Sequence, residues 1–284
     1  MKKISALAAL ITCALNSFSQ SESATNKITT PIIKEARILY QQEMASWYGT
    51  DVFLENYKKK ENIGGYFSYL ENDSAKCVFF SKAEYPIVIG TITFDQSYDL
   101  NKAKRNFDER AFSKKETDFY AIRNTAVKAT QTDTTFKFYK NANFNFVPII
   151  NDLEKKVYVL TGPKENGLVI FGNDYLLKFD KDNNLQNIKR LHKNIIFNKY
   201  TGDENEVGSM HTHLKETGDF PTATDLCTLM LYGKFTKWKT YNVLSPNYFS
   251  IWDIKKNDLT VITREALERI TKDQAESHPI KKDQ

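Results

Sequence analysis

Two histidines separated by one residue, His211 and His213, are the residues of this sequence best placed to do chemistry. On a β-strand the side chains of positions i and i+2 point to the same face, so the two imidazoles would lie side by side. Neutral imidazole is a good zinc ligand, and catalytic zinc sites use three protein ligands plus an open position. Asp225, a short distance downstream, is the candidate third ligand.

The elements that must position these ligands are expected to be a strand, a loop and a helix. Pro221 and Thr222 are typical of a loop end followed by a helix N-cap, and Gly233 is typical of a helix C-terminus, so we predict a helix over 222–232. Asp225 would lie in its first turn, where the helix dipole favours a negative charge. The sequence thus predicts two histidines at a strand end and an aspartate at a helix start.

This stretch resembles the signature of the JAMM (JAB1/MPN/Mov34) metalloprotease family. That signature is His-x-His-Pro, seven residues between the second His and a Ser, then Ser-x-x-Asp, with a Glu upstream. His211, His213 and Asp225 match the family's metal ligands, and Thr222 stands in the place of the Ser. Leu214 replaces the Pro, and eight residues separate His213 from Thr222. The resemblance implies a Zn²⁺-dependent hydrolase with a peptide or protein substrate, or a catalytically inactive domain of the same fold that serves as a binding or assembly module.

The resemblance also implies a catalytic glutamate, because a carboxylate near the zinc site takes the proton from the attacking water. In the family this residue lies just ahead of a Gly-x-Leu-type strand. Glu165, in the run KENGLV, is the closest match, with one residue fewer before the glycine than in the family. The hydroxyl of Thr222 would help to stabilise an oxyanion, and the alternative is that Thr222 only caps the helix. Other candidates for the glutamate are Glu154, Glu204 and Glu206.

Other histidine-based metal folds fit less well. Metallo-β-lactamase-like hydrolases resemble His-x-His-x-Asp-His, whereas His213 is followed here by Leu, Lys and Glu. Amidohydrolase barrels need roughly 250 residues, and only about seventy follow His213. His192 falls inside a predicted strand and is interpreted as a packed or surface histidine. The polar segment 180–184 is interpreted as a turn, since it lacks the glycine and distal glutamate of a calcium loop.

The first residues carry an export signal. A basic start, an apolar run over 4–15 and small residues up to Ser19 predict a signal peptide over 1–20, and the protein is expected to be periplasmic or secreted. Cys13 raises the alternative of a lipoprotein anchor, which is not favoured because Thr12 stands where a small Gly or Ala is expected. No later run of eighteen apolar residues exists, so no integral membrane segment is predicted.

Charge and cysteine content exclude further classes. The net charge is +5, and basic and aromatic residues do not interleave, so nucleic-acid binding is not predicted. After the signal segment only Cys77 and Cys227 remain, too few for a disulfide scaffold. They could pair, but two separately buried thiols are favoured.

Hydrophobic patterning predicts an α+β protein. In the second half we expect a mixed sheet with a central helix after the His-x-His strand, as the resemblance to the JAMM fold implies. The first half is predicted to be a separate α+β region. The resemblance is close over 207–233 and loose over 155–263. The predicted division is a signal peptide (1–20), an N-terminal region (21–134), a JAMM-like metal-binding domain (135–272) and a flexible tail (273–284).

Within these regions the pattern predicts a mobile leader over 21–30, followed by local elements. The predicted helices are 31–48, 99–129 (broken near Ser113), 222–232 and 264–271. The predicted strands are 66–70, 77–81, 87–94, 136–139, 144–149, 157–160, 167–172, 175–179, 188–197, 240–244, 248–254 and 259–263.

Overall fold

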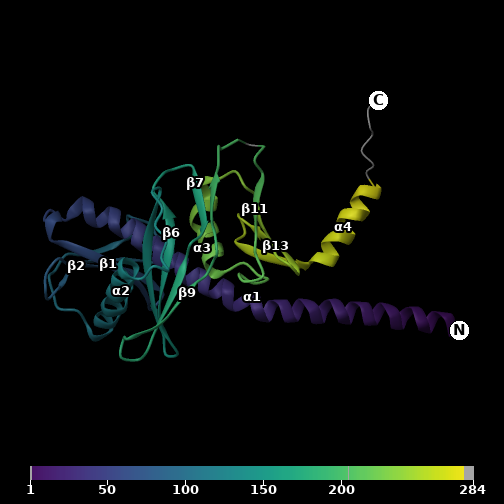
Figure 1. The fold of residues 1–284 in the computed structure, drawn as a ribbon, viewed down its shortest axis with the longest axis horizontal. Coiled ribbons are helices and arrows are strands. Elements are labelled where there is room, and N and C mark those ends of the chain that lie inside the picture. The colour runs from purple at the N-terminus through teal and green to yellow at the C-terminus, as the bar shows by residue number, and fades with distance from the viewer. Residues whose placement is uncertain (1, 204, 278–284) are drawn as a thin grey trace.

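A computed structural model describes residues 2–203 and 205–277, without the side chains of 2–24, 274, 275 and 277. In these ranges the chain has the predicted α+β class, with helices packed on largely antiparallel sheets (Figure 1). The α-helices are α1 (Lys2–Asn56), α2 (Lys114–Thr132), α3 (Ala223–Tyr232) and α4 (Arg264–Ser277).

The first sheet follows α1 directly. Its strands are antiparallel in the order β1 (Ile63–Glu71), β2 (Ser74–Ser81), β3 (Val88–Phe94) and β4 (Lys104–Asn106). Asn72 and Asp73, which join β1 to β2, both have positive φ, as a tight two-residue hairpin turn requires. The predicted strands 66–70, 77–81 and 87–94 are confirmed.

The predicted helix over 99–129 is correct only after Ser113. The side chains of Asp95, Asp99 and Asn106 accept hydrogen bonds from backbone N–H groups two residues further on, which stabilises turns in place of a helix. Ser113 then caps α2, and its side chain accepts from the backbone N–H of Glu116 while the Glu116 carboxylate accepts from that of Ser113.

The second sheet is antiparallel in the order β5 (Ala142–Ile150), β6 (Lys155–Pro163), β8 (Tyr175–Phe179) and β9 (Leu185–Arg190). The strand predicted at 136–139 is wrong, because this segment lies outside the ladder and is held by side chains. The Lys137 N–H donates to the Tyr175 hydroxyl, and the Lys137 carbonyl accepts from the Asn173 amide.

The third group of strands carries the histidines. β7 (Leu168–Gly172) pairs with β10 (Ile195–Lys199), and a separate mixed sheet has the order β11 (Gly208–Thr212), β12 (Thr240–Leu244), β13 (Tyr248–Asp253) and β14 (Asp258–Thr263). β11 and β12 are parallel, and α3 lies in the connection between them. A parallel pair needs such a crossover, so the chain after the histidines must return along a helix.

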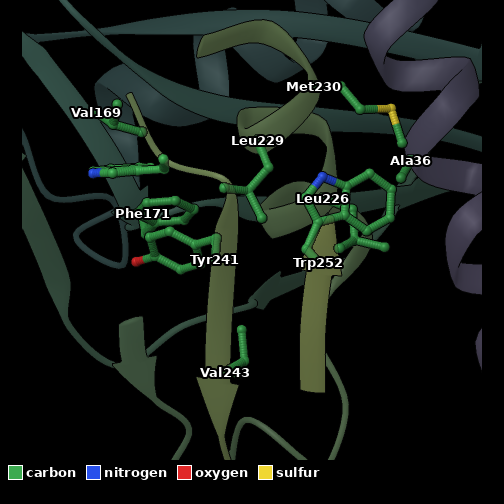
Figure 2. Packing of buried hydrophobic residues seen from close by; sticks show 10 residues of the cluster. Ala36, Val169, Phe171, Leu226, Leu229, Met230, Tyr241, Val243 and Trp252 are labelled. Atoms are coloured by element: carbon green, nitrogen blue, oxygen red, sulfur yellow. The ribbon is translucent and has the colours of Figure 1, made fainter. Parts of the chain in front are cut away.

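Helix α1 is shared between the hydrophobic cores, and its apolar residues face different sheets along its length. Ala36 packs with Leu226, Leu229, Met230 and Trp252 of the second half, a cluster seen in Figure 2. Farther along, Ala45, Val52 and Phe53 pack on the first sheet. Figure 1 shows α1 running along the length of the molecule.

The start of α1 corrects one prediction. The helix passes through 21–30 and Pro31, where a leader and a helix start were predicted. The buried Thr29 hydroxyl donates to the Thr25 carbonyl, and Ile32 and Ile33 pack against the core just after the proline. This packing stabilises a helix that Pro31 weakens by removing one N–H donor. The signal-peptide prediction begins at residue 1, outside the described residues, and it remains a prediction.

The C-terminal helix is longer than predicted. α4 extends to Ser277, beyond the predicted end at 271, and 278–284 lie outside the described residues. Cys77 and Cys227 are free and buried, as favoured from the sequence. Among the described residues, no helix combines the length and apolar character needed to cross a membrane.

Candidate metal centre

The paired histidines lie where the sequence places them, at the end of a strand. His211 is in β11, and the His213 N–H continues the parallel ladder by donating to the Leu244 carbonyl at 2.8 Å. Their ring centroids are 4.9 Å apart, so the prediction that both imidazoles share one face is confirmed.

Asp225 faces the histidines from the first turn of α3. Its Oδ2 accepts hydrogen bonds from the backbone N–H and the hydroxyl of Thr222, both at 2.7 Å, and the Thr222 hydroxyl accepts from the Asp225 N–H at 3.1 Å. This capping box holds the carboxylate in one orientation. Oδ1 is buried and accepts no well-aligned hydrogen bond from the described residues, although His192 Nε2 lies 3.2 Å from it. Thr222 is therefore a helix cap, and its predicted oxyanion role remains a prediction.

His192 joins this group, contrary to its interpretation as a packed or surface histidine inside a strand. The predicted strand 188–197 is two strands, because β9 pairs with β8 whereas β10 pairs with β7 in another sheet. The chain turns between them, and the turn directs His192 inward, with Nε2 3.2 Å from Asp225 Oδ1. The role of His192 becomes visible only because β9 and β10 pair with different strands, and no local sequence signal indicates it.

The donor atoms converge closely enough to bind one ion. Ligand atoms of His192, His213 and Asp225 lie within 4.8 Å of one another, and all three residues are buried. His213 Nε2 is 3.2 Å from Asp225 Oδ2, while His211 Nε2 is 3.8 Å from Asp225 Oδ1. His211, a predicted ligand, thus borders the tight group, and its ligand role remains a prediction.

The cluster leaves an unusual number of polar atoms unsatisfied. Five atoms are buried with no well-aligned hydrogen bond from the part of the chain that the structure describes: both ring nitrogens of His213, Nε2 of His211, Nδ1 of His192 and Oδ1 of Asp225. Buried polar groups are normally hydrogen-bonded, so a concentration of orphaned atoms in one place needs an explanation. A metal ion would satisfy several of them at once, and the residues present therefore fit such an ion.

The electrostatics also suit a cation. Burial raises the pKa of Asp225, but the neighbouring histidines, His192 first, outweigh it and hold the pKa well below its usual range. Burial lowers the pKa of His211 to about 4, so its imidazole is neutral. Burial also lowers the pKa of His192, but the carboxylates of Asp225 and Asp174 outweigh burial and leave it raised. The cluster therefore offers an ionised carboxylate and a neutral imidazole.

A second layer of polar groups supports the histidines. Asp174 Oδ2 lies 3.8 Å from Nδ1 of His192, and burial raises the pKa of this carboxyl to about 6. On the other side the Tyr241 hydroxyl is 3.0 Å from Nδ1 of His211 and accepts from the Asn198 amide at 2.9 Å. Phe171 stacks on Tyr241 (Figure 2), and both rings also contact the ring of His211.

A small cavity of about 90 Å³ lies against the cluster and is lined in part by His192, His211, His213 and Asp225. No glutamate of the described chain lines it. Phe171 and Gly172, at the C-terminal end of β7, line this cavity. Glu165 lies at the other end, just before the first residue of the strand.

The structure does not bring the predicted glutamates to the metal centre. The length of β7 puts Glu165 on the order of 10 Å or more from the cluster, and Glu165 lines two other cavities. Glu154 pairs with Lys156, and Glu206 accepts from the Trp238 indole and from Thr201. Glu204 lies outside the described residues.

Comparison with known proteins adds no relative. No family model, no curated protein and no solved structure matches the chain. The case for this centre therefore rests on its own geometry: a buried group of two histidines and an aspartate that could hold a metal ion.

Proposed function

We propose that the protein is an exported, zinc-dependent hydrolase of the JAMM kind that acts on peptide or isopeptide bonds. The observation that carries the proposal is the convergence of His192, His213 and Asp225 at a small cavity, where several of their polar atoms have no hydrogen-bond partner among the described residues. Two imidazoles and a carboxylate match the composition of many catalytic zinc sites, which leave a further position open. A zinc ion held there would act as a Lewis acid and lower the pKa of water to about 7.

The chain's own residues have separate tasks in this proposal. Asp225 would bind the ion through Oδ1, because Thr222 occupies Oδ2. Asp174 lies behind His192 and would orient its ring, as second-layer carboxylates do for metal-bound histidines. His211 is neutral, its Nδ1 lies beside the Tyr241 hydroxyl, and it lines the same cavity, so its Nε2 would supply a further imidazole ligand, as the sequence predicts.

A second candidate function is a metal-binding module of the same layout without catalysis, serving in binding or assembly. The observation that favours it is the absence of a glutamate among the described residues that line the cavity. A hydrolase of this kind needs a base within hydrogen-bond reach of the attacking water. Leu214 in place of the family's proline fits this alternative as well.

The test begins with elemental analysis and zinc titration of protein purified without a histidine tag. We expect one zinc ion per chain, lost in His192→Ala, His213→Ala and Asp225→Asn. It should be retained in Asp258→Asn, a matched change at an exposed aspartate of β14. Unchanged zinc binding in all three site variants would show that these residues are not ligands.

Catalysis is tested separately, with an internally quenched peptide library and a lysine ε-linked isopeptide as substrates. Cleavage that disappears in the site variants supports the hydrolase. Stoichiometric zinc without cleavage of either substrate class would favour the non-catalytic module. Absence of zinc would contradict both candidates.

A further inference from the structure

A second, larger cavity lies away from the metal centre. Its volume is about 560 Å³, and its walls come from α1, β1, β5, the segment around Glu165 and the C-terminal end of α3. Tyr232, at that end of α3, is two helical turns from Asp225, or about 10 Å along the helix. The cavity is therefore distinct from the metal centre, and a ligand could occupy it whether or not a metal ion is bound.

Its most unusual wall residue is Glu43, on the buried face of α1. This residue is only 8% exposed, and its Oε2 accepts one hydrogen bond, from the Asn145 amide at 2.8 Å. Its Oε1 accepts no hydrogen bond from the described residues. Among those residues, no lysine, arginine or histidine forms an ion pair with the Glu43 carboxylate. Burial raises the pKa of Glu43 to about 7. A buried carboxyl with so few partners is costly to the fold, so a ligand that pairs with it would relieve that cost.

The remaining walls favour a positively charged partner. Trp47, Tyr66, Tyr232 and Phe235 supply aromatic surface. The Lys234 ammonium, which is not part of the cavity wall, lies 5.9 Å from the centroid of the Trp47 ring and 5.0 Å from that of Phe235, so these rings already attract one cation.

The charges around the cavity point the same way. Besides Glu43, the carboxylates of Asp51 and Glu165 line it. Among the described residues, the basic groups near them are Lys164 in the wall and Lys234 beside Trp47 and Phe235, so acidic groups still outnumber basic ones. An anionic ligand would meet an excess of negative charge, whereas a cation would find a counter-ion at the inner end and aromatic rings along its stem.

We propose that this cavity binds an organic cation, an alkylammonium or guanidinium group on an apolar stem, with Glu43 as its buried counter-ion. Trp47, Tyr66 and Tyr232 cover the stem, and the acidic rim of Asp51 and Glu165 attracts the charge. A lysine or arginine side chain of a peptide and a free amine share this chemistry, and the experiment separates them.

The experiment is calorimetric titration of the full-length protein with three probes. Butylammonium represents a free amine, N-acetyl-lysine amide represents a peptide side chain, and N-acetyl-norleucine amide is a neutral analogue of the latter that lacks the ammonium group. We expect saturable binding of at least one cation. The neutral analogue should bind more weakly by about tenfold or more, as the loss of a charge-assisted hydrogen bond implies. Tighter binding of the lysine derivative than of butylammonium would assign the cavity to peptides, and the reverse would assign it to free amines.

Two variants locate the binding. Glu43→Gln should weaken cation binding by about tenfold or more and leave the binding of N-acetyl-norleucine amide unchanged. Glu55→Gln, a matched change on the exposed face of α1, should bind like the parent protein. Equal affinities of the parent protein for lysine and norleucine derivatives would overturn the proposal without recourse to a variant. Absence of saturable cation binding, or unchanged binding in Glu43→Gln, would overturn it too.

Discussion

Replacing Glu43 with glutamine should make the protein more stable at high pH, although it removes a charged residue. Burial raises the pKa of Glu43 from 4.5 to about 7. A pKa difference of one between the folded and unfolded protein corresponds to about 1.4 kcal/mol, so the ionised form costs the fold about 3 kcal/mol. Because the folded pKa is raised, this cost is absent below pH 4.5, grows as the pH rises from 4.5 to 7 and is complete above 7. A glutamine carries no charge, and its amide oxygen can still accept the hydrogen bond from Asn145.

The assay is urea unfolding of the parent protein and Glu43→Gln at pH 4 and pH 8. We expect nearly equal free energies of unfolding at pH 4, and an advantage of up to about 3 kcal/mol for the variant at pH 8. Other titrating groups are common to both proteins and cancel in the difference. Glu55→Gln, which alters an exposed glutamate of the same helix, should show no such pH dependence. A stability difference that does not change with pH, or a variant less stable at pH 8, would refute the reasoning.

Three further substitutions test the supports of the metal centre and its core. Asp174→Asn should weaken zinc binding by about 10- to 100-fold in calorimetric titration, because Asp174 lies behind His192; unchanged affinity would exclude that role. Thr222→Ala should lower the free energy of unfolding by about 0.5–2 kcal/mol in urea through loss of the cap, whereas Thr222→Ser should retain it. Leu229→Ala should cost about 2–5 kcal/mol in the same assay, since Leu229 is 1% exposed in the core beneath the site; a cost below about 1 kcal/mol would contradict its packing.

The sequence predicted those parts of the site that lie on one local element. His211, His213, Thr222 and Asp225 belong to a single strand, loop and helix. Their spacing places the two histidines on one face of the strand and Asp225 in the first turn of the helix. His192 was missed for the opposite reason. The alternation of apolar and polar residues over 188–197 fits one strand as well as two. Only the pairing of β9 with β8 and of β10 with β7 shows that the segment is divided into two strands, with His192 between them.

The same distinction explains the helix predictions. α3 has strong end signals at Thr222 and Gly233, and its predicted bounds are nearly those observed. Polar side chains that bond the backbone locally prevent a helix over 99–112, an effect that hydrophobic periodicity does not detect. The continuation of α1 through Pro31 depends on packing against the second half of the chain.

The position of α1 has a consequence for the order in which the chain can fold. α1 precedes every strand of the described chain, yet Ala36 shares a core with Leu226 and Leu229 of α3, which follows β1 to β11. This core also takes in Trp252 of β13, which follows α3. Contacts between such distant parts of a chain slow folding, because the loop between them must be closed before the contact contributes. We therefore expect the core that α1 shares with the second half of the chain to be completed late in folding, after α3, β12 and β13 have formed.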